Sequence, residues 1–365
     1  MNQPPVPFVD LKIQHARVAE EVARGFEEVL AETSFILGPR VERFERELAA
    51  YCGVGDTVGV GNGTDAIELA LSGVGIGRGD EVIVPANTFV ATAEAVVRVG
   101  ADVVLCDVTP DHLIDPDRAR DAVTERTRAV IGVDLYGQIA PFERLRDAVP
   151  GDVRLVEDAA QSQGARRFGV RSGAVADVAS TSFYPGKNLG AYGDGGAVMT
   201  ADAGVADRVR RLRNHGGIAR YEHALTGINS RLDSLQAVVL SAKLAELDLW
   251  NKERQAAADR YRSLLADTGL ELPEVADGNE HVWHLYVVQT DDRPGLQAAL
   301  DRAGVAHGVH YPAPVHLLPA FAHLGHGLGD FPVAERAAGR ILSLPIFPGI
   351  TAEQQERVAA AARGA

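Results

Sequence analysis

A lysine on a tight loop is the first residue whose surroundings suggest chemistry. Lys187 lies in Thr181-Ser-Phe-Tyr-Pro-Gly-Lys-Asn-Leu-Gly190, which follows an apolar run and leads into Gly193-Asp-Gly-Gly196. Most lysines are surface residues. A loop bounded by glycines also suits an amine aimed into a site, where partial loss of water lets it form a Schiff base. The loop is not a Walker A motif, because Asn188 follows the lysine and the upstream glycine is missing.

A carboxylate at the end of an apolar run is the second candidate. Asp158 lies in Val156-Glu-Asp-Ala-Ala-Gln-Ser-Gln-Gly164, at the predicted carboxyl end of a strand, where α/β sheets usually build their sites. A buried carboxylate is costly unless it is paired. One use for it is to keep a ring nitrogen protonated, since an opposite charge nearby favours the charged form. The alternative is an aspartate that caps the next turn.

A glycine-rich turn is the third candidate. In Gly59-Val-Gly-Asn-Gly-Thr-Asp-Ala-Ile-Glu-Leu-Ala-Leu71, a predicted strand ends in glycines and a helix begins at Thr64. The free N–H groups of a helix N-terminus bind phosphate. The alternative is a plain glycine turn with Thr64 as N-cap. The glycines lack the GxGxxG spacing of a dinucleotide-binding motif.

Strands that alternate with helices must position these residues. Residues 14–52 are predicted to be helical. Seven strands are predicted after them, at 58–60, 81–85, 103–107, 129–135, 154–157, 178–183 and 196–199, with helices at 64–72, 88–99, 116–123 and 141–148. This alternation predicts an α/β fold with a mostly parallel, seven-stranded sheet.

The pattern changes after Thr200, where long helices are predicted, one running toward Trp250 and a second from Arg254 to Leu265. From about residue 272 the sequence predicts a smaller α+β segment, with strands at 284–289 and 305–311 and a helix at 295–303. We therefore expect an N-terminal arm and large α/β domain over residues 1–250 and a small C-terminal α+β domain over 251–365.

Composition narrows the class of protein. The 365 residues carry a net charge of −14, which disfavours bulk nucleic acid as a partner. Two cysteines, Cys52 and Cys106, make no disulfide framework. The first residues do not form a signal peptide, and no apolar run is long enough for a membrane span. We expect a cytoplasmic protein without a membrane partner. We also expect no metal, because the five histidines between His307 and His326 lack zinc-ligand spacing.

Several of these motifs occur together, in order, in one known family. The stretches Ser182–Lys187, Glu157–Gln161 and Asn62–Ala66 resemble the DegT-type (DegT/StrS) sugar aminotransferases. The resemblance runs from Phe8–Leu11 and Gly38-Pro39 past Gly227–Arg231 to His310–Pro312. It implies the fold-type I architecture of enzymes that depend on pyridoxal 5′-phosphate (PLP), and ping-pong transamination with L-glutamate as amino donor.

The resemblance also implies a role for individual residues. Lys187 would form the Schiff base with PLP and move the proton, while Asp158 would hold the pyridine nitrogen protonated. Gln161 would bind the phenolic oxygen, and Phe89 would stack on the ring. The phosphate would be bound by residues of three segments: Gly63, Thr64 and Asp65, Ser182, and Asn229 of a neighbouring subunit. The active unit would then be a homodimer with shared active sites.

One position departs from the family, which usually has histidine where this chain has Gln163. Glutamine does not titrate near neutral pH, so we assign no acid/base role there.

Two segments, Asn229–Asp233 and His310–His316, indicate the substrate. They resemble those of the family branch that acts at the sugar 3-position and makes amino sugars for antibiotics and other natural products. This branch implies a dTDP-3-keto-6-deoxyhexose as acceptor. Six residues are candidates for contact with the nucleotide-linked keto-sugar: Arg220, Tyr221, His223, Arg231, His310 and His316. His316 could equally be a packing histidine.

Other functions stay open at this point. A 4-keto-sugar aminotransferase or a cyclitol aminotransferase would use the same catalytic residues. A sugar dehydratase of the same fold would carry histidine in place of Lys187. A PLP-binding regulator without turnover is disfavoured by the full set of Asp158, Gln161 and Lys187.

Overall fold

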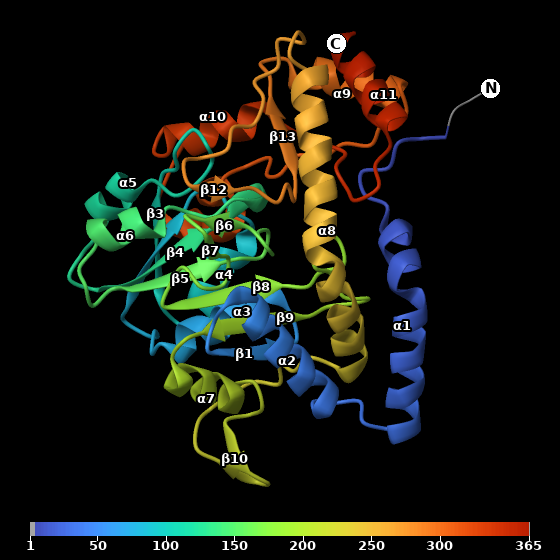
Figure 1. Cartoon of the computed structure of the whole chain (residues 1–365). Helices are drawn as coiled ribbons and strands as arrows, with labels where there is room; N and C mark the ends of the chain where they lie inside the picture. Colours follow the sequence, from blue (N-terminus) through green and yellow to red (C-terminus); the bar gives the residue numbers. More distant parts are fainter. Residues whose placement is uncertain (1–3, 365) are drawn as a thin grey trace.

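The computed structural model describes residues 4–364 and is built around a seven-stranded sheet (Figure 1). From edge to edge the strands are β1 (Asp56–Val60), β9 (Gly196–Thr200), β8 (Val178–Ser182), β5 (Arg154–Asp158), β4 (Thr127–Val133), β2 (Glu81–Pro85) and β3 (Asp102–Cys106). β9 is antiparallel to both of its neighbours, and the other pairings are parallel. The seven predicted strands and the mostly parallel sheet are confirmed.

Helices connect these strands and cover the sheet. They are α3 (Gly63–Gly73), α4 (Val90–Arg98), α5 (Pro116–Asp121), α6 (Phe142–Ala148) and α7 (Ala203–Leu212). Every residue of β2 and β9 is buried, as expected for strands that have a layer on each face. This arrangement brings the carboxyl ends of β1, β2, β5 and β8 to the same edge of the sheet.

The N-terminal helical segment is two helices rather than one. α1 (Leu11–Glu32) ends at Thr33, which has a left-handed backbone, and α2 (Pro39–Cys52) begins with Pro39 at its first turn. Proline fits the first turn of a helix but disfavours helical geometry in the residue before it. Gly38 takes a positive φ of 87° there. The prediction of one helical stretch over 14–52 was therefore wrong at residues 33–38.

A single long helix, α8 (Ser234–Leu264), leads from the large sheet into the C-terminal part. The predicted boundary after residue 250 falls inside this helix, so the two predicted helices are one. The division into domains 1–250 and 251–365 stays a prediction.

The C-terminal part contains a two-stranded sheet of β13 (Tyr286–Gln289) and β14 (Ile341–Leu344), with α9 (Arg293–Arg302), α10 (Pro332–Arg340) and α11 (Ala352–Arg363). The strand predicted at 305–311 was wrong. Its backbone pairs at two isolated points, Val305 with Val6 and Gly308 with Ser343.

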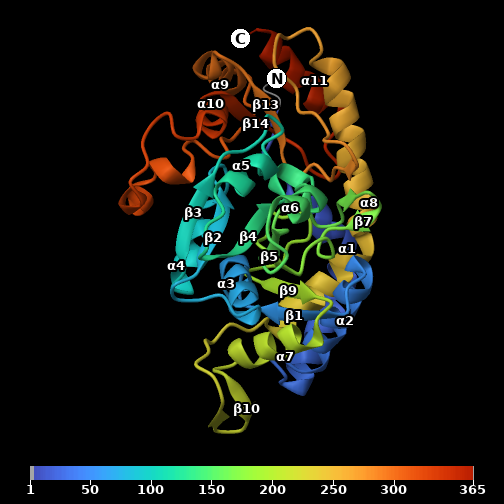
Figure 2. The ribbon, with the colours of Figure 1, turned by 90° about the vertical axis from the view of Figure 1, so that its left-hand side faces the viewer.

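Two small sheets lie outside the core. One joins β12 (Asn279–Glu280), β6 (Arg166–Arg167) and β7 (Val170–Arg171). The other is a hairpin of β10 (Gly217–Ala219) and β11 (Glu222–His223), which projects from the body beyond α7 (Figure 2).

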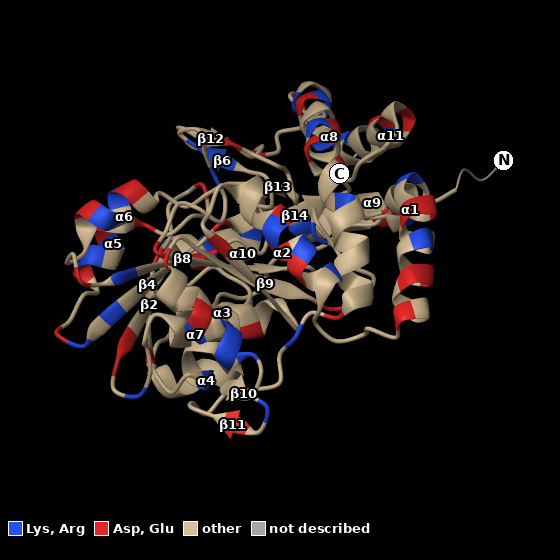
Figure 3. Ribbon diagram, turned by 60° about the horizontal axis from the view of Figure 1, so that its bottom comes forward, with Lys and Arg blue, Asp and Glu red and all other residues tan. Residues whose placement is uncertain are grey.

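The surface mixes both signs of charge. Acidic and basic residues lie side by side on α1 and on α5 and α6 (Figure 3). None of the helices in residues 4–364 combines the length and the apolar character needed to cross a bilayer.

Candidate active site

A cavity of about 790 Å³ lies at the carboxyl ends of the central strands. It brings together eight of the residues singled out from the sequence: Gly63, Thr64, Phe89, Asp158, Gln161, Ser182, Lys187 and His310. These residues come from segments up to 247 positions apart in the chain, so the cavity is a product of the fold and not of one motif.

Lys187 lies on the loop after β8 and points into this cavity. Its backbone N–H donates to Tyr184 O at 2.9 Å, which closes the tight turn. Burial lowers the pKa of its amine to about 8, although the Asp158 carboxylate opposes that shift. About a tenth of the amine is therefore uncharged at pH 7, far more than for an exposed lysine, and an uncharged amine is nucleophilic.

Asp158 is the last residue of β5 and is held by two donors. Thr92 Oγ1 donates to its Oδ2 at 2.8 Å, and the Ala160 N–H donates to its Oδ1 at 3.2 Å. Thr92 has one hydroxyl proton, so Thr88, whose Oγ1 lies 2.9 Å from that of Thr92, must donate to it in turn. Burial raises the pKa of Asp158, while these donors and the Lys187 charge lower it. A cationic ring nitrogen would suit this fixed, buried carboxylate.

Gln161 is oriented from both ends of its amide. Oε1 accepts from the Tyr136 N–H at 2.8 Å, and Nε2 donates to Tyr311 Oη at 3.2 Å. The side-chain nitrogen has two protons, so one remains for an oxygen in the cavity.

The N-terminus of α3 forms the opposite end of the cavity. Asn62 is its N-cap, not Thr64 as in the sequence-based alternative. A Cβ added to Gly63 would lie 2.5 Å from Ser182 Cβ, so only glycine lets the helix start approach the end of β8 so closely. In the described chain the N–H groups of Gly63 and Thr64 have no hydrogen-bond partner, which leaves them for an anion.

One predicted phosphate donor at this end already has a partner within the chain. The Asp65 N–H donates to Asn62 Oδ1 at 2.8 Å, and its carboxylate pairs with Arg98 at 3.2 Å. The side chain of an asparagine N-cap accepts a hydrogen bond from the N–H three residues later, which is here the Asp65 N–H. Asp65 itself does not line the cavity.

Aromatic and imidazole rings form one wall. Phe89, half exposed at the N-terminus of α4, lies 5.4 Å from the ring of Tyr311. His310 stacks on Phe8 of the N-terminal arm, and its Nδ1 lies 2.8 Å from Ser343 Oγ. Flat rings on this wall suit a planar ligand.

This donor set fits PLP: a buried carboxylate for a ring nitrogen, an amine of lowered pKa, an aromatic wall, and a helix N-terminus for a phosphate. Within residues 4–364 no cluster of three or more histidine, cysteine or acidic side chains is arranged to bind a metal ion.

Five predicted residues lie outside the cavity of their own chain. Arg220, Tyr221 and His223 lie on the projecting β10–β11 hairpin, and Tyr221 is 82% exposed. Asn229 is exposed and pairs with Asn214 through the backbone, and Arg231 Nη1 donates to Asn214 Oδ1 at 2.9 Å. One chain therefore does not bring these residues to its own cavity.

His316 is buried and does not line the cavity of its own chain. Its side chain is fully buried, and its Nε2 lies 3.0 Å from Glu335 Oε1. Glu335 also accepts from the N–H groups of Gly329 and Phe331, so the pair fixes the loop before α10. The packing alternative noted for this histidine describes its position.

Gln163 also lies outside the cavity. Its Nε2 donates to Ser182 O at 2.8 Å and to Thr181 Oγ1 at 3.0 Å, behind β8. This position agrees with the absence of an assigned acid/base role.

Among the cavity residues that the sequence did not single out are Thr92, Arg254, His284 and Tyr311. Thr92 lies one helical turn after Thr88, a spacing that the sequence showed. Arg254 and His284 come from α8 and the C-terminal part, and no local pattern predicts that they reach the cavity.

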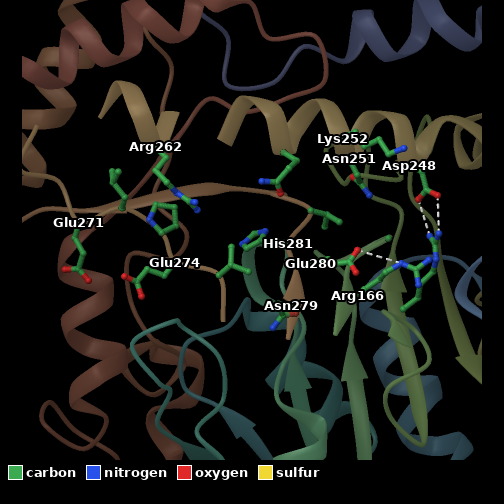
Figure 4. A pocket seen from close by; sticks show the side chains of 17 residues that line it. Arg166, Asp248, Asn251, Lys252, Arg262, Glu271, Glu274, Asn279, Glu280 and His281 are labelled. Carbon is green, nitrogen blue, oxygen red and sulfur yellow. Dashed lines mark hydrogen bonds and ion pairs between the residues drawn. The ribbon is translucent and has the colours of Figure 1, made fainter. Parts of the chain in front are cut away.

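A larger, more open groove of about 1100 Å³ lies between α8, β6–β7 and the segment before β13 (Figure 4). Four of its charged side chains pair with one another, Arg171 with Asp248 at 3.1 Å and Arg166 with Glu280 at 4.0 Å. None of the predicted site residues lines it, so the groove offers no comparable chemistry.

Known proteins are similar to this chain over nearly its whole length. The model of the DegT/DnrJ/EryC1/StrS aminotransferase family matches residues 16–363. The dTDP-3-amino-3,4,6-trideoxy-alpha-D-glucose transaminase of Streptomyces venezuelae is 47% identical over 363 residues, covering 99% of this chain and 96% of that protein.

Solved structures agree with the sequence match. The crystal structure of S. venezuelae DesV in complex with a ketimine intermediate has a TM-score of 0.97 at 46% identity, covering 99% of this chain and 98% of that one. NtdA of Bacillus subtilis with bound cofactor PMP has a TM-score of 0.90 at 32% identity, covering 99% and 85%. The expected fold and the expected cofactor are confirmed. The chain therefore belongs to the DegT/DnrJ/EryC1/StrS aminotransferase family and is a PLP-dependent sugar aminotransferase.

Proposed function

We propose that this enzyme transfers the amino group of L-glutamate to a dTDP-3-keto-6-deoxyhexose and releases the dTDP-3-amino sugar. The observation that carries the proposal is the gathering of Lys187, Asp158 and Gln161 in one cavity, in a chain 47% identical to a dTDP-3-amino-sugar transaminase over nearly its whole length.

PLP, when bound, supplies a carbonyl carbon that condenses with amines and a ring that takes up electrons from the substrate carbon. Asp158 holds a proton on the ring nitrogen. The free N–H groups of Gly63 and Thr64, with the Ser182 hydroxyl, bind the phosphate. Phe89 packs on the ring face. The remaining Nε2 proton of Gln161 binds the phenolic oxygen, and Tyr136 and Tyr311 keep that amide in place.

Lys187 then has two tasks. Its uncharged amine would hold the cofactor, and when free the same nitrogen would take a proton from the substrate carbon and deliver it to the carbon on the other side of the shared nitrogen. A lysine whose pKa is lowered to about 8 does both near neutral pH, because it can accept and give up a proton there.

The acceptor sugar needs residues from a second copy of the chain. Asn229 and the hairpin residues Arg220, Tyr221 and His223 lie away from their own cavity, with Arg231 just after Asn229. In a homodimer with shared sites, Asn229 would reach the phosphate of the partner's cofactor, and the cationic side chains would face the nucleotide diphosphate. His310, in the cavity itself, would contact the sugar.

The test is a product assay with defined sugars. The purified, PLP-loaded enzyme is incubated with L-glutamate and, separately, a dTDP-3-keto-6-deoxyhexose, its 4-keto isomer and a keto-cyclitol, and products are identified by mass spectrometry. We expect 2-oxoglutarate and a dTDP-3-amino sugar in equal amounts. A product only from the 4-keto sugar or the cyclitol would replace the substrate. No turnover of any acceptor would favour a PLP-binding regulator.

A further inference from the structure

A buried arginine in the active-site cavity has no acidic partner. Arg254, in the middle of α8, is 2% exposed, and it lines the cavity together with His284, His310 and Lys187. Among residues 4–364, no carboxylate oxygen lies within 4.0 Å of its guanidinium, and burial alone lowers its pKa, to about 10.

Only part of the guanidinium is used by the fold. Nη1 donates to Trp283 O at 3.0 Å and to Ile346 O at 2.9 Å, with His284 O at 3.5 Å. Nε is buried without a hydrogen-bond partner, and Nη2 makes no hydrogen bond within the described chain. The fold therefore satisfies Nη1 of the guanidinium and leaves Nε and Nη2 without acceptors, which is costly for a buried cation.

The groups around Arg254 are mostly basic or neutral. The pKa of His284 is lowered well below its ordinary value by burial and then by the positive charges of Lys187, Arg254 and His310. Asn188 fixes that ring: its Nδ2 donates to Asn251 Oδ1 and Val282 O, both at 2.9 Å, so its Oδ1 faces His284 Nδ1 at 3.3 Å and requires the proton there. Asp158, which lines the same cavity, is already bound by Thr92 and Ala160.

We propose that Arg254 binds the α-carboxylate of the amino-acid donor, in a subsite that it shares with neutral His284. This inference rests on the proposed function, since it concerns the donor of the same reaction. A carboxylate accepts two parallel N–H bonds from one guanidinium, and in such a pair the charge of the arginine is matched.

The position of Arg254 selects a carboxylate over the diphosphate of the nucleotide sugar. An arginine that is 2% exposed can be reached only by a terminal group. A carboxylate is terminal, whereas the diphosphate carries a substituent on each side. Arg254 should therefore act in the half-reaction with the amino acid and not in the half-reaction with the sugar.

The test separates the two half-reactions. Arg254→Lys keeps the positive charge and a donor for the main-chain carbonyls, but it loses the paired N–H donors of the guanidinium. The matched control is Arg357→Lys, because Arg357 also binds main-chain carbonyls, Ala303 O and Pro4 O, yet does not line the cavity. For both variants, two single-turnover rates are measured. One is the reaction of L-glutamate with the enzyme loaded with PLP, and the other is the reaction of the keto-sugar with the enzyme loaded with pyridoxamine 5′-phosphate (PMP). Binding of glutarate to the PLP form is measured by calorimetry.

We expect Arg254→Lys to weaken glutarate binding and the glutamate half-reaction by about 10-fold to 100-fold, the range for loss of a charged hydrogen bond, and to leave the sugar half-reaction unchanged. Arg357→Lys should leave both unchanged. An equal loss in both half-reactions would make Arg254 a structural residue, a loss with the sugar alone would make it a diphosphate contact, and no loss would remove the subsite.

A second measurement uses the wild-type enzyme and covers the case in which Arg254→Lys does not fold. Isoglutamine, the α-amide of glutamate, lacks the α-carboxylate charge and should donate about 10-fold to 100-fold more slowly than glutamate. Equal rates would overturn the inference while leaving the aminotransferase intact. A wild-type enzyme that accepts no amino group from glutamate would instead overturn the proposed function.

Discussion

The cavity and the β10–β11 hairpin differ in how completely one chain builds them. In the cavity, Asp158 and Gln161 are buried and held by hydrogen bonds from the same chain. On the hairpin, which projects from the body beyond α7 (Figure 2), Ile218 and Tyr221 are 54% and 82% exposed, and neither lines that cavity. One chain brings Asp158 and Gln161 together on its own, whereas Asn229 and the hairpin residues proposed to complete a partner's site are exposed. We therefore expect the catalytic residues of a site to come from one chain, and part of its phosphate and substrate contacts from a second copy.

The largest effect should come from the cavity. Lys187→Ala should reduce transamination at least about 1000-fold, because the residue that moves the proton is lost. Turnover is measured by mass spectrometry of the amino sugar. The variant should still bind PLP without a covalent bond, which absorbance after gel filtration would show. Retained turnover would contradict the role of Lys187.

Asp158→Asn should reduce turnover about 100-fold to 1000-fold, since an amide cannot supply the charge that holds the ring nitrogen protonated. Thr92→Val is the matched control: it keeps the carboxylate, removes one hydrogen bond and should cost less than about 10-fold. Equal losses in the two variants would mean that orientation, and not charge, is what Asp158 provides.

The hairpin side of the comparison is tested through Asn229. Asn229→Ala should reduce turnover about 10-fold, the cost of one hydrogen bond to a charged group. In a shared-site dimer, mixing it with Lys187→Ala subunits places both lesions in one site and leaves the other intact. Random reassembly should then recover about a quarter of the wild-type rate. Activity that does not rise on mixing would contradict a shared site.

The pH dependence of cofactor attachment tests the cavity itself. Only the uncharged amine of Lys187 attacks PLP, and burial lowers its pKa from 10.5 to about 8. Lowering the pKa enlarges the uncharged fraction at neutral pH, so attachment should speed up about fivefold between pH 7 and pH 8 and level off above that. Stopped-flow absorbance on stripped enzyme gives the midpoint. A midpoint near 10 would show that the cavity does not desolvate this lysine.

The smallest effect on activity should come from a buried pair outside both regions. His316→Gln breaks the contact with Glu335 and should lower stability by about 1–3 kcal/mol, with kcat/KM for the sugar unchanged. Denaturant unfolding and steady-state kinetics decide the point. A raised KM at unchanged stability would restore His316 as a sugar contact.

Much of the fold could be predicted from the spacing of apolar residues. The catalytic residues could be predicted from their place at the carboxyl ends of parallel strands. Asp158 and Ser182 end two parallel strands, and Lys187 follows the second, so the sheet itself brings them together. The bond of the Asp65 N–H to Asn62 could have been anticipated, because an asparagine three residues earlier is a good N-cap.

Other residues could not be found this way. Arg254 and His284 reach the cavity through the packing of α8 on the C-terminal part, which no short motif encodes. The burial of His316 depends on Glu335, nineteen positions later in the chain. Long-range pairs of this kind leave no periodic signal in the sequence.

The continuity of α8 has a consequence for engineering. Lys243 donates to Gly190 O on the loop beyond Lys187, Asn251 holds Asn188, and Arg254 meets the cavity, all from one stripe of a helix about 46 Å long. Lys243 and Arg254 are eleven residues apart, which is close to three whole turns. One inserted residue between them would turn the far half by about 100° and misdirect every contact beyond it. Inserting seven or eleven residues would restore the angle but move the far half by about 10 Å or about 16 Å along the axis, so this stretch of the helix tolerates no change in length.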